Sequence, residues 1–513
     1  MFTCWGALPG ELKAAIAACL ARRTDRLHLA LASKECLQHS HAAITRLQIT
    51  DLRAAARRPP LLHFPRARLL RLVPAAAEDD PAAQPTDVLV RFLAAHRGWL
   101  ANVQDVTIHG KLEQPAAAIA LLSSQLPSLR SLSVSVPGCG ALGQALGSCL
   151  PQLRRLQRLS LGMQEVGADP LPAALAELPA LERLDIDDAV DGGACLAGLG
   201  RLSTLTHLWL RTYGPLTAAS RAQAIYQVAQ LTRLQHLDCW LDSRDPALDL
   251  SPWTSLVNLQ QLHTYDLPAH VAAVLATLPS LRSLQLLDLG LADVQGLAAL
   301  QLTHLHVHML YNRGAAPPQH PALAKIGSVS ITCSTSSEQF QRFFSPGALT
   351  SLEVALEDAE VLPQLTRLQR LKLRPPRPAA TTQPGDYCRG VAALAGHLTS
   401  LELQQLKAGA GPQDYAPLRA CTGLRRLLLH DCSGLSLDVL ASLLPALTQL
   451  QQLKILHSGT ASAWCSEAQV HALLHTLGRD EVDAVVCFRC FRLPSSNRVL
   501  SADHLWPWAE AGD

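Results

Sequence analysis

The sequence repeats one short phrase, L-x-x-L-x-L, through most of its length. The phrase recurs fourteen times at a mean interval of about 25 residues, and its first position is Leu or Ile every time. Its third position is apolar except at Cys239 and Thr264. Because one copy cannot bury an apolar face alone, the copies must stack into a single elongated core. They begin at Leu129, Leu156, Leu181, Leu205, Leu234, Leu259, Leu281, Leu302, Ile326, Leu349, Leu368, Leu398, Leu424 and Leu450.

Each copy is predicted to fold as a strand, a loop and a helix. The L-x-L alternation predicts a short strand whose leucines point into the core. Helical spacing and high helix propensity mark the segments 172–179, 224–231 and 438–447. Parallel strands stack ~4.8 Å apart whereas helices are wider, so the predicted solenoid curves with its strands on the concave face. Hydrophobic residues make up 48% of the chain but aromatic residues only 4%, which predicts a core of many small aliphatic layers.

Weaker copies extend the array, and longer insertions interrupt it. Insertions at 242–252, 311–321 and 374–386 each follow a predicted strand, so they should emerge along one rim, either as tolerated loops or as binding loops. Residues 74–87 are predicted to form a flexible loop. The weaker copies are predicted at Ile44, Leu47 and Ile49, at Val103, Val106 and Ile108, and at Val482, Val485 and Cys487.

Over roughly residues 100–490 the chain resembles the leucine-rich repeat family. The resemblance implies an α/β solenoid shaped as a horseshoe, with parallel strands on the concave face and helices on the convex face. In that family the phrase commonly continues to an Asn or Cys that bonds to the loop backbone, and here only Cys432 fits. The turns after the other strands must be satisfied differently. The predicted divisions are a helical segment at 1–45, irregular first repeats at 46–100, the solenoid at 101–490 and a tail or cap at 491–513.

The N-terminal segment differs from the repeats. Residues 7–37 contain no repeat phrase, and apolar residues every four positions predict a helix with one apolar stripe. The segment resembles an F-box, whose pattern is roughly L-P-x-E-L-x-x-x-I-x-x-x-L, then an Asp-containing turn and a second helix. It departs from that pattern by an extra residue before the turn and at Arg26, Ala32 and Cys36. It agrees at Leu8, Pro9, Glu11, Leu12, Ile16, Leu20, Asp25, Ser33 and Lys34.

The F-box resemblance implies that Leu8, Pro9, Leu12, Ile16 and Leu20 bind a Skp-type adaptor of a cullin-RING (SCF-type) ubiquitin ligase. The repeats would then hold the protein substrate. The alternative is that these helices only cap the open end of the first repeat. The chain would in that case be a plain binding scaffold of the cytoskeletal or axonemal assembly type, or an inhibitor. Adaptor binding distinguishes the two hypotheses.

The predicted substrate-binding surface consists of strand side chains that lie between the inward leucines. Large rings and charged residues fall there on neighbouring strands, and such residues are the usual anchors of recognition. The alternative is that the curved sheet partly buries these rings, which then only cover the core. An enzyme regulator that supplies Arg211 in trans is a further hypothesis. The surface comprises Asp185, Asp187, Trp209, Arg211, Asp238, Trp240, His263, Tyr265 and His306.

Two groups of side chains have the ligand types that zinc prefers. His304, His306 and His308 share one strand face, but neighbours on that face are ~6.6 Å apart, a wide spacing for one ion. His471 and His475 stand four apart on a predicted helix near the C-x-x-C motif at 487–490, yet they lie beside its apolar face. A closing repeat, with Cys487 at an inward strand position, is the preferred interpretation. We therefore predict no metal and no cofactor.

Charge and motifs argue against several classes of function. Lys and Arg total 44 and Asp and Glu 42, so no overall field favours nucleic acid or a membrane surface. The sequence contains no stretch of 18 apolar residues and no Walker, G-x-G-x-x-G, H-E-x-x-H or G-x-S-x-G motif. Scattered cysteines and the lack of a signal-like start predict an intracellular protein, cytoplasmic or nuclear, or else located at the cytoskeleton or axoneme. We expect a non-enzymatic monomer within a larger complex.

Overall fold

The structure is a computed structural model that spans all 513 residues. The predicted segment 1–45, the loop 74–87 and the tail 491–513 lie outside the residues described. Those described are 46–49, for the backbone alone, and 68–72, 93, 100–109, 115–135, 146–147, 149–162, 171–187, 198–211, 217–239, 249–265, 269–290, 297, 299–311, 326–374, 383–406, 412–432, 434–457, 466–479 and 481–488.

The chain divides into two compact units, which are described separately. Unit 1 comprises Met1–Ser330 and Arg342–Phe344, and unit 2 comprises Ile331–Gln341 and Ser345–Asp513. Strand β12 (Ser328–Thr335) and helix α13 (Ser337–Phe343) contain the boundaries between them.

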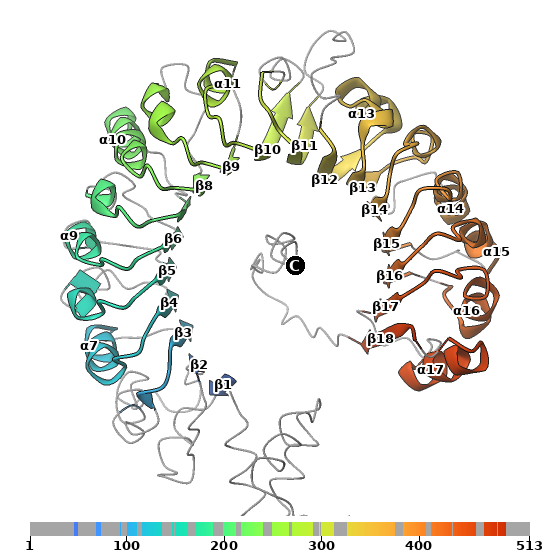
Figure 1. The fold of residues 1–513 in the computed structure, drawn as a ribbon, viewed down its shortest axis with the longest axis horizontal. Helices are drawn as coiled ribbons and strands as arrows, with labels where there is room; N and C mark the ends of the chain where they lie inside the picture. Colours follow the sequence, from blue (N-terminus) through green and yellow to red (C-terminus); the bar gives the residue numbers. More distant parts are fainter. Residues whose placement is uncertain are drawn as a thin grey trace, which may run out of the picture. The chain divides into compact units, whose positions relative to one another are not determined.

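Unit 1 is built on a parallel sheet in which every strand pairs with the next one in the chain. In Figure 1 the strands follow the inner side of the curve of this unit and the helices its outer side. The strands are β1 (Arg46–Ile49), β2 (Leu69–Leu72), β3 (Asp105–His109), β4 (Ser131–Ser135), β5 (Arg158–Gly162), β6 (Arg183–Asp187), β7 (His207–Arg211), β8 (His236–Cys239), β9 (Gln261–Thr264), β10 (Ser283–Gly290) and β11 (His304–Tyr311).

The outer side of unit 1 alternates α-helices with short 3-10 helices. Helix α10 shows why these segments are helical: the hydroxyl of its N-cap residue Thr217 accepts a hydrogen bond from Ser220 N at 3.1 Å, and Ile225 and Val228 are buried. The elements are α7 (Pro115–Gln125), η2 (Leu150–Gln152), α9 (Leu171–Ala176), η4 (Leu199–Arg201), α10 (Ala218–Ala229), η5 (Ser251–Ser255) and α11 (Ala269–Leu275).

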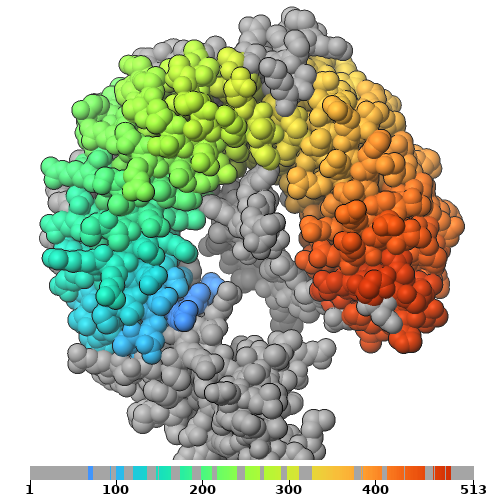
Figure 2. Space-filling view, in the orientation of Figure 1, coloured from blue at the N-terminus to red at the C-terminus, as the bar shows by residue number. Residues whose placement is uncertain are grey.

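The core of unit 1 is a ladder of aligned leucines. Leu159, Leu184 and Leu208 are partners on three adjacent strands, and each is at most 2% exposed. The two exceptions in the repeat phrase, Cys239 and Thr264, occupy the same inward row and are buried as well. On the face seen in Figure 2, successive repeats of unit 1 pack against one another without gaps. The repeat phrase therefore specifies the core, as stacking of small equivalent layers requires.

Unit 2 follows the same plan. Strands β13 to β18 pair in parallel in chain order, and the helices lie on the other side of the sheet (Figure 1). Its strands are β13 (Ser351–Leu356), β14 (Arg370–Leu373), β15 (Ser400–Gln404), β16 (Arg426–His430), β17 (Gln452–His457) and β18 (Asp483–Phe488). Its helices are η8 (Pro346–Ala348), η9 (Leu362–Gln364), α14 (Pro384–Ala392), α15 (Pro412–Tyr415), η10 (Ala416–Ala420), α16 (Leu437–Leu443) and α17 (Glu467–Thr476).

All fourteen strands predicted from the repeat phrase are confirmed, and each begins two residues after the first leucine of its copy. The weaker copies at β1 and β3 are confirmed too. Helices α9, α10 and α16 begin before the three segments predicted to be helical and end two to four residues short of their last residues. The strands, loops and helices of successive repeats thus form a leucine-rich repeat solenoid in each unit. Two predicted insertions are shorter than expected, because η5 begins at Ser251 and α14 at Pro384.

The prediction for the last repeat was wrong by one residue. Ala484 and Val486 pair with Leu453 and Ile455 and are buried, whereas Cys487 is the register partner of Leu456, one position beyond that row. Since successive strand side chains point to opposite faces, a slip of one residue exchanges the two faces. The strand part of the phrase fits Val485 and Cys487 in one register and Ala484 and Val486 in the other, and pairing with β17 decides between them.

The turn after β16 is closed as the leucine-rich repeat resemblance implies. Cys432 is fully buried, and its Sγ lies 3.4 Å from Leu403 O and 3.6 Å from His430 O. In the preceding repeat Leu406 takes the equivalent position and is 1% exposed. Gln405 and Asp431 precede these two residues with positive φ angles of 55° and 52°. A sharp local turn thus allows either a thiol or an aliphatic side chain to end the strand.

Within the described parts of the chain, none of the helices combines the length and the hydropathy needed to cross a membrane.

Candidate functional site

The strand face of unit 1, defined as the side of strands β3 to β11 that points away from the helices, contains a row of four of the predicted binding residues. Asp185, Trp209, Asp238 and His263 are register partners on the consecutive strands β6, β7, β8 and β9. Neighbouring members are therefore ~4.8 Å apart along the sheet. The flanking leucines are buried, while all four of these side chains are half-buried. The alternation thus places carboxylate, indole, carboxylate and imidazole side by side, as the sequence predicts.

Polar contacts hold both carboxylates of this row. Nε of Arg183 donates to Oδ1 and Oδ2 of Asp185, each at 3.2 Å. Nδ1 of His263 lies 2.6 Å from Oδ2 of Asp238. Because each contact joins two strand side chains, the carboxylates have defined directions on either side of Trp209. A row with fixed directions loses little side-chain entropy when a partner binds.

A second row, formed by the first residues of β5 to β8, consists of two arginines and two histidines. Arg158, Arg183, His207 and His236 are register partners on β5 to β8. The rings of His207 and His236 stack with centroids 4.1 Å apart and planes inclined by 15°. Burial, the adjacent His236 ring and the charges of Arg183 and Arg158 lower the pKa of His207 to about 4. Burial also lowers the pKa of His236, although a hydrogen bond that the Gln261 side chain accepts from the ring opposes this shift. Both rings are therefore neutral at pH 7.

The other predicted surface residues are only partly placed by the structure. Asp187 ends β6 and is exposed, Tyr265 directly follows β9 and is half-buried, and His306 of β11 is half-buried. Arg211 is the last residue of β7, and its side chain lies outside the described residues, as does all of Trp240. The predicted adaptor-binding residues are also outside them: Leu8, Pro9, Leu12, Ile16 and Leu20.

The predicted histidine groups have different surroundings. His304, His306 and His308 share one face of β11 and are all half-buried, and burial lowers the pKa of His308. His471 and His475 are exposed on α17, whose Val470 and Leu474 are buried. Among the described residues, no three His, Cys, Asp or Glu side chains are grouped so that they could hold a metal ion.

The strand face of unit 2 contains a charged group that the sequence analysis missed. Nζ of Lys372 on β14 lies 2.7 Å from Oε1 of Glu353 on β13 and 3.9 Å from Oε1 of Glu402 on β15. One row further along, Nε of Arg374 donates to Oε1 of Gln404 at 3.0 Å. No sequence motif marks these charged residues. They could have been found by comparing equivalent positions of consecutive repeats, since Glu353, Lys372 and Glu402 all stand between the second and third apolar positions of their copies.

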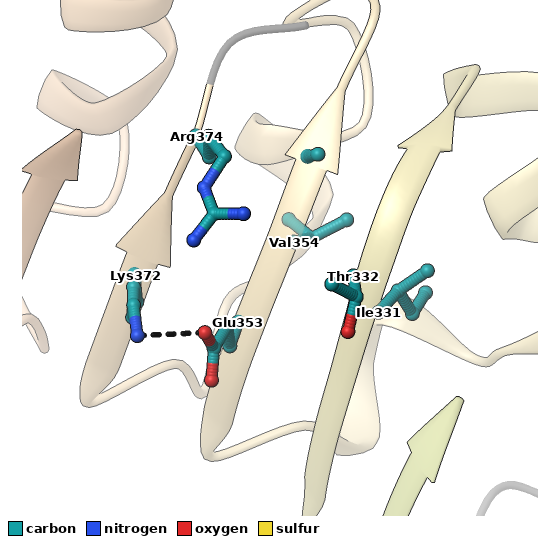
Figure 3. Close-up of a pocket in the computed structure, with 7 residues that line it drawn as sticks. Ile331, Thr332, Glu353, Val354, Lys372 and Arg374 are labelled. Atoms are coloured by element: carbon teal, nitrogen blue, oxygen red, sulfur yellow. Dashed lines mark ion pairs between the residues drawn. The ribbon is translucent and has the colours of Figure 1, made fainter. Parts of the chain in front are cut away.

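A small hollow opens beside this group (Figure 3). Its empty volume is about 220 Å³, part of which is open to solvent. The guanidinium of Arg374 points along the hollow toward the Lys372–Glu353 ion pair (Figure 3). The lining residues are Ile331, Thr332, Glu353, Val354, Ala355, Lys372 and Arg374.

The thiols beneath the helices of unit 2 are buried in its core. Burial raises the pKa of Cys388 and of Cys432 to about 12, and that of Cys421 to about 11. Thiols with such pKa values stay protonated at pH 7 and behave as small hydrophobic side chains.

No protein-family model matches the chain, and no curated protein sequence matches it. Several solved structures are similar to it. An internalin (inlF) from Listeria monocytogenes aligns over 74% of this chain and 96% of its own, with 16% sequence identity and a TM-score of 0.33. Internalin C2 (inlC2) from the same organism covers 41% of this chain and 84% of its own, with 21% identity and a TM-score of 0.27. TLR13, in a complex with ssRNA13, covers 79% and 63%, with 14% identity and a TM-score of 0.34. At such low scores, the assignment of the fold rests on the strand register of the chain itself.

Proposed function

We propose that this chain is a recognition protein without catalytic chemistry of its own. In this proposal the strand face of unit 1 binds a partner protein, and the N-terminal segment 7–37 couples that partner to a cullin ubiquitin ligase through a Skp-type adaptor. The repeats thus choose the substrate and the ligase modifies it.

One observation supports the binding surface: the aligned row of Asp185, Trp209, Asp238 and His263 on four consecutive strands. Aromatic rings beside charged groups are frequent anchors of protein interfaces. The contacts from Arg183 and His263 orient the two carboxylates before any partner arrives. A preorganised row of this kind favours recognition because fewer side chains must be ordered on binding.

The adaptor half of the proposal is supported by the sequence alone. Leu8, Pro9, Glu11 and Leu12 form the L-P-x-E-L start that resembles an F-box, directly before a repeat array. Tethering a substrate and a charged ubiquitin carrier on one scaffold raises their effective concentration, so that transfer to a lysine becomes nearly intramolecular. Such a role requires binding surfaces and no catalytic residue in this chain.

Affinity purification of the full chain and of three variants tests both halves. Deletion of residues 1–45 should remove the adaptor and leave the partners of the strand face. Trp209→Ala should remove the partners of the strand face and leave the adaptor, because it removes the indole between the two carboxylates. Tyr226→Ala is the matched control, since this ring is 57% exposed on α10, on the outer side of the same unit.

Each half of the proposal, adaptor binding and partner binding, would be excluded by a different result. Undiminished adaptor recovery after the deletion would exclude the ligase role and leave a binding scaffold in which the first helices cap the solenoid. Equal loss of partners in Trp209→Ala and Tyr226→Ala would exclude the strand face as the binding surface. Leu8→Glu with Ile16→Glu repeats the first comparison without shortening the chain.

A further inference from the structure

The strand face of unit 2 contains an arginine, Arg374, that forms no ion pair with the described residues around it. Among the residues that the structure describes, Arg374 makes one side-chain hydrogen bond, from Nε to Oε1 of Gln404 at 3.0 Å, and no ion pair. Lys372, by contrast, lies between Glu353 and Glu402 and contacts both. The two terminal nitrogens of the Arg374 guanidinium therefore remain available as donors.

The position of Arg374 is set by a buried neighbour. Gln404 is 8% exposed, and its Nε2 donates in turn to Oε1 of Glu402. This chain of hydrogen bonds from β15 fixes the Nε edge of the guanidinium. The opposite edge is directed toward the hollow, as Figure 3 shows. A guanidinium held along one edge keeps its fork of N–H groups in a constant direction, which suits a planar acceptor with two oxygens.

The hollow exists because the residue beside Arg374 is small. Val354 and Leu373 are register partners, so Ala355 is the neighbour of Arg374 on β13. A methyl group there leaves space between the guanidinium and Thr332 of β12. The hollow is therefore lined by the polar side chain of Thr332 and by charged side chains, with the small Ala355 beside Arg374.

We propose that this hollow binds the carboxylate of an aspartate or glutamate side chain from an acidic segment of a partner protein. The terminal nitrogens of Arg374 donate to its two oxygens, and Lys372 adds a favourable charge from the next row. Glu353, Lys372 and Arg374 line the hollow and Glu402 contacts Lys372 from the far side, so these four charges sum to zero, and the attraction for a carboxylate comes from the N–H donors of Arg374. A phosphate carries up to two negative charges, so Glu353 and, beyond Lys372, Glu402 would repel it more strongly than they repel a carboxylate. The proposal concerns unit 2 alone and does not depend on the partner or the adaptor proposed above.

Fluorescence anisotropy with a labelled peptide tests this site in the full chain. The probe is an alternating Ser-Glu peptide at low ionic strength, with a Ser-Gln peptide of equal length as the neutral comparison. Arg374→Gln should weaken binding of the Ser-Glu peptide about tenfold, which corresponds to about 1.4 kcal/mol. Arg374→Lys should weaken it as well, because an ammonium cannot form the paired contact. Arg370→Gln is the matched control: it removes the same charge from the exposed start of the same strand, and it should change binding less than twofold.

Three results would overturn the proposal. The first is equal binding of the Ser-Glu and Ser-Gln peptides to the unmodified chain. The second is an equal loss in Arg374→Gln and Arg370→Gln, which would indicate a diffuse field and no site. The third is tighter, Arg374-dependent binding of a peptide in which one Glu is replaced by phosphoserine, which would assign the hollow to phosphate. Circular dichroism of each variant verifies that the fold is retained.

Discussion

Replacing Leu427 with Ala should destabilise unit 2 much more than the same replacement at its chain neighbour Leu428. Leu427 is 2% exposed and lies in the inward row between Leu401 and Leu453. Leu428 lies on the strand face and is half-buried. The two substitutions remove the same atoms from the same strand, so they differ only in the face from which the atoms are lost.

The expected magnitudes follow from burial. Leu→Ala removes three carbon atoms, and at about 0.8 kcal/mol for each buried carbon the lost transfer free energy at Leu427 is about 2.4 kcal/mol. A cavity remains, because the aligned leucines above and below are held by their own strands, and this brings the total to about 3–5 kcal/mol. At Leu428 solvent fills the space and part of the side chain was exposed already. The loss there should stay below about 1.5 kcal/mol.

Hydrogen exchange followed by mass spectrometry measures this difference repeat by repeat. In a solenoid each repeat contacts only its neighbours, so the destabilisation should be concentrated in peptides from β15, β16 and β17. A loss of about 3 kcal/mol corresponds to an increase of roughly a hundredfold in their exchange rate when opening is in rapid equilibrium. Peptides from β4 to β6 in unit 1 should not change. If Leu428→Ala matched Leu427→Ala, the assignment of faces, and with it the account of the core, would be refuted.

Two further predictions concern protonation and close packing. The pKa of His207 is about 4 in the folded chain and near 6.5 in the unfolded chain, so the free energy of unfolding should fall as the pH drops from 6.5 to 4. Urea titrations at a series of pH values should show a smaller fall for His207→Gln than for the unmodified chain. A ring titration midpoint near 6.5 by NMR would contradict this reasoning. Gly390→Ala should lower the free energy of unfolding by about 1–3 kcal/mol, because the added Cβ would lie 2.8 Å from Cδ1 of Leu362. At Gly396 an added Cβ meets nothing within 4 Å, so Gly396→Ala should change that free energy by less than about 0.5 kcal/mol. Equal effects of the two substitutions in thermal unfolding would show that the helix containing Gly390 can shift to make room.

The strands were predictable because the six residues of each copy of the phrase are enough to indicate a strand and its buried face. Leu132, Leu159 and Leu184 need no knowledge of distant residues, since the next copy supplies the partner strand about 25 residues later. The same reasoning explains why Cys239 and Thr264 were placed correctly: their neighbours in the stack fix the register even where the side chain is not aliphatic.

The last repeat was not predictable in this way. At β18 the stretch V-D-A-V-V-C offers two registers, and among the described residues no later strand constrains the choice. Pairing with β17 aligns Ala484 and Val486 with the inward row and leaves Cys487 out of it. Periodicity identifies a strand, but an apolar run without clean alternation does not identify which face is buried.

The candidate site was predictable in place but not in its contacts. The alternation located Asp185, Trp209 and Asp238 on one face, yet no pattern indicated that Arg183 and His263 would hold the two carboxylates. The His207–His236 stack was not predicted, because nothing in the sequence indicates that two histidines about one repeat apart bring their rings into contact. Side-chain contacts between strands depend on rotamers, which the repeat does not encode.

In each repeat the inward leucines and the strand residues between them are under different physical constraints. This difference explains how one fold can present a specific binding surface. The leucines must be buried whatever the chain binds, whereas the residues between them face away from the helices and can vary without cost to the core. Their charges are nevertheless coupled, because register partners are only ~4.8 Å apart. Lys372 shows this coupling: it lies between Glu353 and Glu402, so its removal would leave two carboxylates without their shared counterion. A change at one strand position therefore alters the electrostatics of both adjacent repeats, and recognition by such a face is a property of neighbouring strands together.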